Sequence, residues 1–571
     1  MRPRVAYRGW GDRNFPTLAG STGWGRGCWR RFGAGAATLV RVGHCLASGP
    51  GGVAAGGSGS TRWCPFGRVL GLGFPHPLQS AISQFPFFFF AMKTQPAIPA
   101  AEKRLADADI TAAVERLLQL KKGVHPQFIT VVCHDGIVEL VGFTDSLLSR
   151  ERATDIAKAV RGVRGVINEI SIRTADVPDA ELKRRVEQAL GQDPAVGDYN
   201  VRCHVHGGAL TVEGTLQSWA EEQLALTVLH AVPGVRQIYN RLRVRGGELL
   251  NSDEEITTQI QAFLTWDIRV KSPLVRIRTT HGVVHLAGTV GTAAERDQVV
   301  DTAYLAGATR VEARELLVAY WALDKELRRQ KFMPQADEAV AEAVRDVLRY
   351  DPRVRLFEPS VHVRDGVVVL AGTVSNLRAR LAAEQDAGNV VGVWDVHDLL
   401  QVQVENPAPN GTIHQQARVA LAIDPYVGHY AFTMSVREGR LQLYGSVASH
   451  FDQERAADVV AGINGVVELT NHVQVFAPDN QRFALASVSG PSGLSALSGL
   501  ERDQLLEQRI RSHYYWSAQL HDQDIAVGVR EGRVTLVGTV DTWLDRKCAA
   551  ADAYACGAGN VNNHLRLPTA A

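Results

Sequence analysis

The sequence is short of the features that mark a disulfide-stabilised, membrane-spanning or catalytic protein. Seven of its 571 residues are cysteine. The longest apolar block, residues 85–92, contains Pro86 and falls far short of the roughly 18 to 20 residues that span a bilayer. The chain has no glycine-rich phosphate loop, no nucleophile elbow and no C-x-x-C metal spacing. We therefore expect no transmembrane segment, no enzymatic activity and no cofactor.

Formal charges almost cancel over the whole chain, at +1, but their distribution is uneven. Residues 1–91 hold ten Arg, no Lys and a single acid, Asp12, in a glycine-rich background without apolar periodicity. We interpret residues 1–106 as a disordered extension or as sequence outside the natural product, with translation starting at Met92. Beyond that point the net charge is about −8, which argues against nonspecific binding of polyanions. Because no signal peptide follows Met92, we expect a cytoplasmic protein.

A pair of glycines six residues apart recurs six times along the chain. Successive pairs are separated by 72, 74, 84, 73 and 93 residues, so one small module has been copied. The pairs are Gly136 with Gly142, Gly208 with Gly214, Gly282 with Gly288, Gly366 with Gly372, Gly439 with Gly445, and Gly532 with Gly538.

The residues around each pair predict a β-hairpin. In the fourth repeat, Val361 and Val363 before the turn and Val368 and Leu370 after it alternate with other residues, as in a strand with one buried face. The first glycine of each pair supplies the positive φ of a tight turn. Cys133 and Cys203 share the core parity of these strands, and Cys548 and Cys556 fall in a predicted helix. All four indicate buried thiols rather than a disulfide set.

Helical patterns flank each hairpin. Apolar residues two turns apart follow the second glycine, and a further glycine then leads into a third strand. Upstream, Asp179 and Asp337 each precede apolar residues at helical spacing, which makes these aspartates plausible N-caps. The order is helix, strand, strand, helix, strand. A right-handed crossover predicts an α+β module with a three-stranded mixed sheet, both helices on one face and the other face open.

These patterns divide the chain into six modules. Their expected bounds are 107–173, 178–245, 253–318, 336–404, 411–476 and 501–567. Most linkers are short and restrict motion, whereas the Ser/Gly-rich linker 477–500 predicts a flexible tether and residues 319–335 can continue as a helix. A module of about 67 residues buries only some 60% of its unfolded surface, so contacts between neighbours are expected to help.

The module resembles the BON domain, a family named for bacterial OsmY and nodulation proteins. The resemblance rests on the Asp-Gly-type turn, the V-x-L-x-G strand, the alanine-rich helix and a closing motif such as GVVELTNHVQV from Gly465. The third repeat departs most, with Ala313 where the others have Asn or Asp. The resemblance implies attachment to phospholipid membranes or envelope proteins, a role in osmotic or envelope stress, and often a periplasmic location.

The open face of the second module is the strongest candidate for binding. Its outward positions are basic, which suits anionic phospholipid head groups; the alternative is a solvated sheet face. The candidate lipid-binding residues are Arg202, His204, His206, Arg241, Arg243 and Arg245. The two histidines share one strand face without an evident third ligand, so we expect no metal site.

Four asparagines of the third strands share the parity of the buried positions. We expect them to tie the strand to a nearby loop backbone rather than to contact a ligand. They are Asn168, Asn240, Asn471 and Asn563.

Two other functions stay open. Potassium sensing, known for some BON proteins, would require converging backbone carbonyls. RNA binding would require an exposed pair of strand aromatics or a GXXG clamp; we assign neither, so no specific nucleic acid is expected. The favoured interpretation is a non-catalytic binding or scaffold protein.

Overall fold

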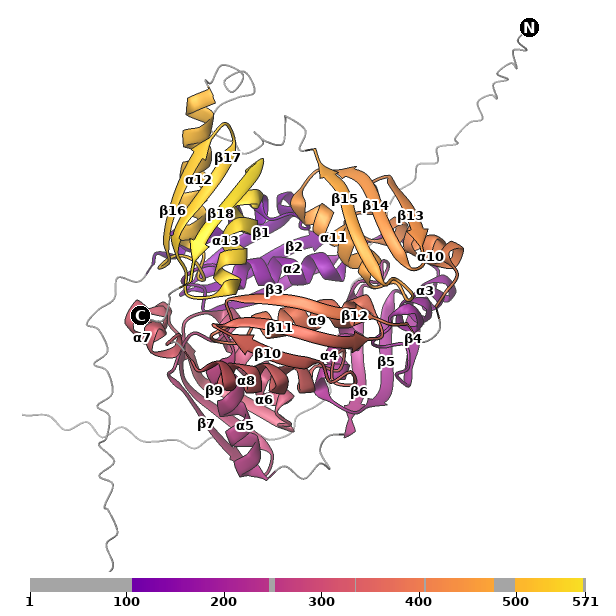
Figure 1. Cartoon of the computed structure of the whole chain (residues 1–571), viewed down its shortest axis with the longest axis horizontal. Helices are drawn as coiled ribbons and strands as arrows, with labels where there is room; N and C mark the ends of the chain where they lie inside the picture. The colour runs from indigo at the N-terminus through magenta and orange to yellow at the C-terminus, as the bar shows by residue number, and fades with distance from the viewer. Residues whose placement is uncertain (1–104, 246–251, 334, 405–406, 477–498, 568–571) are drawn as a thin grey trace, which may run out of the picture. The chain divides into compact units, whose positions relative to one another are not determined.

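A computed structural model describes residues 105–245, 252–333, 335–404, 407–476 and 499–567. Within these ranges the chain forms six three-stranded sheets, each with a helix before its first strand and another between its second and third strands (Figure 1). The first two strands of each sheet are antiparallel and the last two parallel, as in β1–β2 and β2–β3. The predicted α+β fold of six αββαβ modules is confirmed. The proposed extension and start site at Met92 lie outside the described residues.

The modules, numbered 1 to 6 along the chain, repeat the same elements. First helices are α1 Asp107–Leu120, α3 Asp179–Gln192, α5 Asp253–Trp266, α8 Asp337–Tyr350, α10 Asn410–Ile423 and α12 Gly499–Trp516. First strands are β1 Ile129–His134, β4 Val201–His206, β7 Val275–Thr280, β10 Ser360–Arg364, β13 Phe432–Arg437 and β16 Asp524–Arg530. Second strands are β2 Ile137–Thr144, β5 Ala209–Leu216, β8 Val283–Val290, β11 Val367–Val374, β14 Arg440–Val447 and β17 Arg533–Thr539.

The rest of each module follows the hairpin. Second helices are α2 Leu147–Lys158, α4 Trp219–His230, α6 Ala293–Leu305, α9 Leu377–Gly388, α11 His450–Ala461 and α13 Trp543–Ala555. Third strands are β3 Gly165–Ile172, β6 Gln237–Val244, β9 Arg310–Val318, β12 Asp395–Val402, β15 Glu468–Val475 and β18 Asn560–Arg566. Between modules 3 and 4 the chain forms a short 3-10 turn, Tyr320–Leu323, and α7 Lys325–Lys331. This agrees with the helical continuation expected there.

The first glycine of each pair turns the hairpin, as expected. All six have positive φ, between 70° and 80°, a conformation that costs glycine little. They are Gly136, Gly208, Gly282, Gly366, Gly439 and Gly532.

The second glycine of each pair has a different role, which its spacing alone did not predict. In four modules a Cβ would collide with a backbone oxygen where the chain enters the first strand; these glycines are Gly142, Gly214, Gly288 and Gly538. In module 5 a Cβ on Gly445 would instead meet the Phe432 ring at 2.8 Å. Gly372 of module 4 has no atom closer than 3.7 Å, but its φ is +136°, which only glycine adopts readily. The second position therefore requires glycine for close approach to the backbone in modules 1, 2, 3 and 6, and for its positive φ in modules 1, 3, 4 and 6. In module 5 the close contact is with a side-chain ring.

The aspartate at the start of the first helix is not an N-cap, contrary to expectation. Ala336 caps α8, and Asp337 is the first residue inside the helix. Its carboxylate accepts hydrogen bonds from the turn amides of Asp365 at 2.8 Å and Gly366 at 3.0 Å. Equivalent bonds recur in the other modules, with Asn410 in place of Asp in module 5. This residue thus anchors the first helix to the hairpin.

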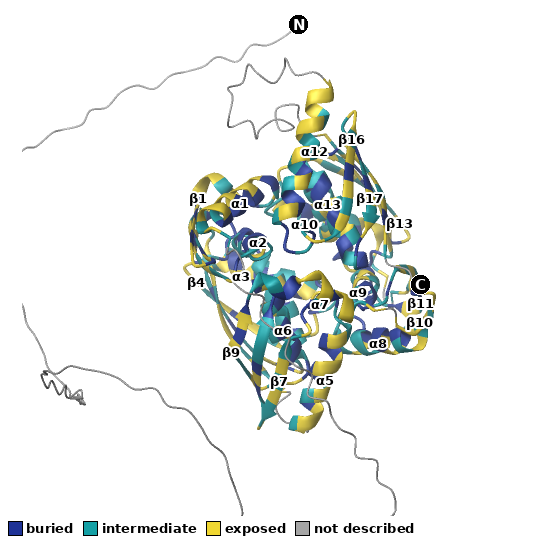
Figure 2. Ribbon diagram, turned by 90° about the vertical axis from the view of Figure 1, so that its left-hand side faces the viewer, coloured by how far each residue is buried: buried dark blue, intermediate teal, exposed yellow. Residues whose placement is uncertain are grey.

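Buried and exposed residues alternate along the strands (Figure 2). In β1 the pattern is strict, with Ile129, Val131 and Cys133 facing the helices. Module 3 has a register shift in the pairing of β8 with β9 between His285 and Ala287. The departure noted at Ala313 is therefore a local irregularity in a strand that still forms.

Backbone hydrogen bonds join modules that are neighbours in sequence and also modules that are far apart in sequence. The end of α5 in module 3 bonds to the end of α9 in module 4, with Ile268 N donating to Asn389 O at 3.0 Å and Val391 N donating to Trp266 O at 2.8 Å. The ends of α12 in module 6 and α2 in module 1 bond in the same way. There Arg161 N donates to Trp516 O at 2.9 Å and Ala518 N donates to Ala159 O at 3.0 Å. The last module therefore contacts the first.

Other contacts also occur twice, once in modules 1–3 and once in modules 4–6. Leu147 of α2 packs in the core of module 2, and Leu377 of α9 packs in the core of module 5. Trp219 of α4 stacks near Tyr304 of α6 at 5.8 Å between ring centroids, and His450 of α11 meets Tyr554 of α13 at 3.9 Å. The chain is thus two equivalent triplets of modules.

These contacts predict that module 6 stays bound even when the chain that links it to module 5 is cut. That linker, residues 477–498, lies outside the described residues. Cutting the chain between residues 480 and 495, at an inserted protease site, should leave module 6 bound to the remaining fragment. The reason is that module 6 makes backbone and side-chain contacts with modules 1 and 3. Size-exclusion chromatography of the cleaved protein under native conditions measures this, and elution of residues 499–571 as a separate small species would contradict it.

Candidate functional site

The residues of the predicted basic face lie together on the open sheet of module 2. Arg202, His204 and His206 are exposed along β4, and Arg241 and Arg243 along β6, with Arg245 directly after it. The strand order is β4-β5-β6, so β5 separates the two rows of basic side chains.

An acidic residue stands in the middle of this face. Glu213 of β5 is paired in register with Arg202 on one side and Arg241 on the other. Its carboxylate lies 3.2 Å from the Arg241 guanidinium, with both side chains well exposed. Glu213 is at an outward position of β5. The alternation of inward and outward residues that predicted the arginines on this face therefore also predicts Glu213 there. The pair reduces the positive charge of the face and leaves Arg202, Arg243 and Arg245 in excess.

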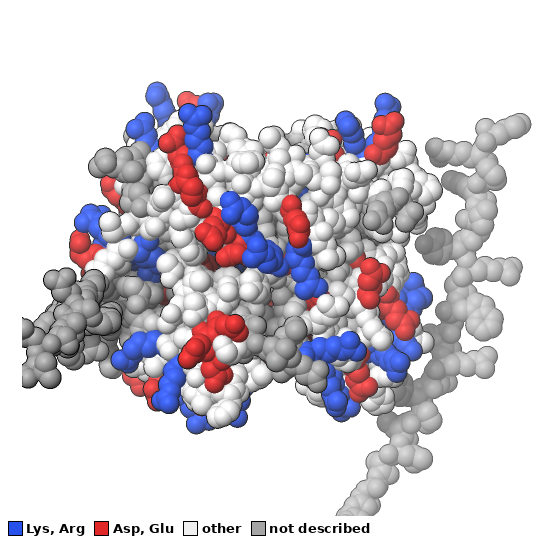
Figure 3. Space-filling model, turned by 60° about the horizontal axis from the view of Figure 1, so that its bottom comes forward, with Lys and Arg blue, Asp and Glu red and all other residues white. Residues whose placement is uncertain are grey.

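The open faces of the modules differ in chemistry. Module 1 presents apolar residues, with Val132 37%, Ile137 43%, Val141 38% and Ile167 51% exposed. On the side of the molecule drawn in Figure 3, basic and acidic side chains are interspersed. The modules therefore repeat a fold without repeating a binding surface.

The asparagines of the third strands make structural hydrogen bonds. The amide nitrogen of Asn471 donates to Gln453 O in α11 at 3.2 Å, and its side-chain oxygen accepts from Val473 N at 3.0 Å. Asn168 and Asn563 bond in the same way to carbonyls of their second helices, whereas Asn240 donates to the Glu222 carboxylate. The partner is a helix rather than the expected loop. In module 3, which lacks the asparagine, Arg296 donates to the backbone oxygen of Ala313.

Within the described ranges, we looked for side chains that could bind a metal and for reactive cysteine thiols. No cluster of three or more His, Cys, Asp or Glu residues suited to a metal occurs there. Cys133, Cys203 and Cys556 are free and buried. Burial raises the pKa of the Cys203 thiol to about 11, which keeps it protonated and poorly nucleophilic at neutral pH.

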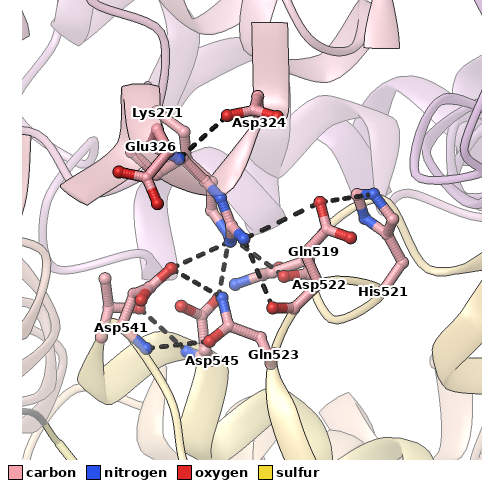
Figure 4. A network of polar contacts seen from close by, with 11 residues as sticks. Lys271, Asp324, Glu326, Gln519, His521, Asp522, Gln523, Asp541 and Asp545 are labelled. Atoms are coloured by element: carbon pink, nitrogen blue, oxygen red, sulfur yellow. Dashed lines mark hydrogen bonds and ion pairs between the residues drawn. The ribbon is translucent and has the colours of Figure 1, made fainter. Parts of the chain in front are cut away.

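Buried charges occur instead where modules meet. Lys271 of module 3 donates to the Asp545 carboxylate of module 6 at 3.2 Å and to Gln519 O at 3.0 Å, and Asp545 is fully buried (Figure 4). In the same network Arg328 of α7 lies 2.9 Å from Asp541. Removing one partner of a buried pair leaves an uncompensated charge, so we expect these residues to disfavour other pairings of the modules.

A second buried cluster joins modules 1 and 6. Asp552 of α13 lies 3.2 Å from the Lys121 ammonium and 3.1 Å from His513 Nε2. Burial alone would raise the pKa of Asp552, but Lys121 and His513 outweigh it and hold that pKa well below its usual range. The carboxylate is therefore charged at neutral pH and fixes the end of α1 to α13.

Converging backbone carbonyls, the requirement for potassium binding, occur at the end of α5. The Lys331 ammonium lies among them and donates to the oxygens of Leu264, Asp267 and Val270. Burial lowers the pKa of Lys331 to about 8. The Lys331 ammonium thus occupies the position among the carbonyls that a monovalent cation would take. The same hydrogen bonds attach the end of α7 to module 3.

The chain belongs to the BON domain family. The BON domain model matches six segments of the sequence, at residues 106–174, 178–246, 252–319, 336–404, 410–476 and 502–569. Osmotically-inducible protein Y of Escherichia coli (strain K12) is 27% identical over 146 residues, which cover 24% of this chain and 73% of that protein.

Solved structures similar to the chain include two of CdsD, a structural protein of the type III secretion system of Chlamydia trachomatis. One, of its C-terminal domain, is 14% identical and covers 40% of this chain and 100% of that one, with a TM-score of 0.11. The other is 16% identical and covers 41% and 97%, also with a TM-score of 0.11. Among the described residues, no helix is both long enough and apolar enough to cross a membrane.

Replacing Asp552 with Asn should destabilise the protein at neutral pH by about 3–5 kcal/mol, because the Lys121 ammonium loses its buried counter-charge. The pKa of Asp552 is lower in the folded protein than in the unfolded chain, where it is near 3.9, so its ionisation stabilises the fold above about pH 4. This stabilisation is lost as the pH falls toward the folded pKa, and the difference in free energy of unfolding between parent and variant should therefore shrink below about pH 4. Urea unfolding from pH 3 to 8 measures that difference.

Asp524→Asn is the matched control, since Asp524 is exposed on β16. It should change the urea midpoint little at any pH. An Asp552→Asn protein as stable as the parent at pH 7 would show that this cluster does not hold modules 1 and 6 together.

Proposed function

We propose that the protein is a non-catalytic binding and scaffold protein whose second module contacts anionic phospholipid head groups. The basic open face of module 2 carries the proposal. Arg202, Arg241, Arg243 and Arg245 are exposed there, and Glu213 is the single acid at the outward positions of β4, β5 and β6. Basic residues near an anionic membrane surface contribute about 1 kcal/mol each.

An exposed aromatic residue supports the same surface. Tyr239 is 49% exposed on β6, in register with Thr211 and His204. Tyrosine is enriched at membrane–water interfaces because its ring is apolar and its hydroxyl is polar. A tyrosine in the same outward row as Arg241 and Arg243 suits a head-group layer better than bulk water.

The family and its relative suggest the physiological setting. The match to an osmotically inducible protein supports a role in osmotic or envelope stress, by analogy alone. The proposal allows for a cytoplasmic location and for the periplasmic location typical of the family. Anionic phospholipids suit the basic face in both cases.

Protein binding is a second candidate, favoured by module 1. Its open face presents Val132, Ile137, Val141 and Ile167 around Glu139, which is in register with Val132 and Ile167. Exposed apolar residues gathered on one face mark interaction sites. Joined to module 2 in one body, this face would let the protein bring an envelope-associated protein to a membrane surface. RNA binding ranks below these two: Tyr239 and Tyr444 are exposed strand aromatics, which base stacking would use, but they lie on different modules. Lys331 fills the carbonyl cluster that would suit potassium.

Replacing Arg241, Arg243 and Arg245 with Ser should weaken binding to anionic liposomes. Three lost contacts of about 1 kcal/mol each predict a decrease on the order of a hundredfold at low salt. Salt should reduce binding by the parent, because the interaction is screened beyond about 10 Å at 0.1 M. Glu213→Gln should strengthen binding, since it removes the acid between Arg202 and Arg241. Liposome co-sedimentation with phosphatidylglycerol-containing and purely phosphatidylcholine vesicles measures each effect.

A matched control removes the same number of positive charges from the open face of another module. Arg276, Arg278 and Arg310 are exposed on β7 and β9 of module 3, and their replacement by Ser also removes three positive charges. If both triple variants lose binding equally, net charge rather than the face of module 2 is responsible. Unchanged binding by the module 2 variant would leave protein scaffolding as the function.

A further inference from the structure

The outer edge of β1 in module 1 is uncharged. Within the described ranges the sheet order is β1-β2-β3, and β1 pairs with β2 alone. The backbone amides and carbonyls of its other edge are therefore a template for a further strand, and proteins usually protect such an edge with charged side chains. None of the six residues of β1, Ile129–His134, is Lys, Arg, Asp or Glu. This edge therefore lacks the usual protection.

The other strands that form sheet edges in the described part of the chain all carry charge. Each third strand contains at least one acidic or basic residue. The uncharged edge is therefore specific to module 1 and is not a property of the repeated fold. The first strands of modules 2 to 6 carry Arg202 in β4, Arg276 and Arg278 in β7, Arg364 in β10, Arg437 in β13, and Asp524 and Arg530 in β16.

The middle of this edge is apolar on the open face. Val132 is 37% exposed there, and its diagonal neighbours on β2, Ile137 and Val141, are 43% and 38% exposed. Thr130 and His134, which flank Val132 on the same face of β1, are exposed as well. β-Branched residues pack well against the side chains of a neighbouring strand. A strand added at this edge would cover Val132 without burying a charged side chain of β1.

We propose that β1 pairs in antiparallel fashion with β1 of a second copy of the chain, which joins two module 1 sheets into one six-stranded sheet. The pairing is symmetric when Val132 lies opposite its own counterpart, because a twofold axis then passes between the two valines. Thr130 of each copy then faces His134 of the other. The open faces stay uncovered and become continuous, so the pairing neither requires nor prevents lipid contact by module 2.

The charges on the open faces favour this pairing in module 1 and oppose it elsewhere. Glu139 is the one charged residue at the outward positions of β1 and β2. In the joined sheet the two Glu139 residues would be three strand spacings apart, about 14 Å, which exceeds the screening length of about 8 Å at physiological ionic strength. The same pairing of β7 in module 3 would bring Arg278 against Arg278, since Arg278 has the position of Val132. Like charges directly opposite each other destabilise a sheet.

Sedimentation velocity of the full chain at micromolar concentration tests the pairing. The parent should sediment as a dimer. Val132→Lys places two ammonium groups opposite each other at the axis and should weaken the dimer by at least about tenfold, because like charges brought together at an interface oppose association. Val132→Glu should act in the same way. Since Val132 is exposed, the circular dichroism spectra of both variants should match that of the parent.

Ser435→Lys is the matched control. Ser435 is exposed at the equivalent position of β13 in module 5, where it lies opposite Gln442 of β14. The substitution adds the same positive charge to the outward row of a first strand that already carries Arg437. It should leave the dimer unchanged.

Mixing the two Val132 variants identifies the residue at the axis. The Val132→Lys and Val132→Glu proteins together should form a dimer with one copy of each, because their side chains then face each other with opposite charge. Native mass spectrometry recognises this mixed dimer by its mass. The proposal is wrong if the parent is monomeric, if Val132→Lys dimerises as tightly as the parent, or if the mixture forms no mixed dimer.

Discussion

The structure depends on the burial of each module's second helix against other modules. A three-stranded sheet with two helices on one face is too small to enclose both helices. Leu147 of α2 and Leu377 of α9 are accordingly buried in the cores of the following modules, and Asp545 of α13 is buried against Lys271 of module 3. The helices thus form the contacts between modules, and the opposite face of each sheet is left free to carry different side chains.

This constraint explains why buried charges and the candidate binding residues occupy different places. Where helices of different modules meet, carboxylates such as Asp552 and Asp545 are buried beside specific cations. We expect such pairs to stabilise little relative to apolar contacts but to disfavour wrong partners, whose charges would stay unpaired. Asp386 of α9 is a different case. Burial raises the pKa of Asp386 well above its usual range, and the nearby Asp351 of the same module raises it further. The buried carboxylates of Asp552 and Asp545 thus have structural partners.

The sequence predicted the module well because its signals are local. Hairpin glycines, strand alternation and third-strand asparagines depend on contacts within one module, and repetition made each visible several times. The first-helix aspartate was misread because an N-cap is the commoner role, and its actual bonds to the turn amides join residues 28 and 29 positions apart. Pairing between modules left no periodic signal: Lys271 and Asp545 lie 274 positions apart. The alternation of residues along the strands predicted that the arginines lie on the open face, and they are exposed there. Glu213, which pairs with Arg241 on that face, was overlooked.

Hydrogen exchange at four backbone amides tests most directly whether the modules form one body. Arg161, Ile268, Val391 and Ala518 each donate to a carbonyl of another module. Mass spectrometry of the intact protein should show these amides protected about as strongly as the strand amides of their own modules. Fast exchange at all four, with the six sheets still protected, would show independent modules on a string and contradict the account.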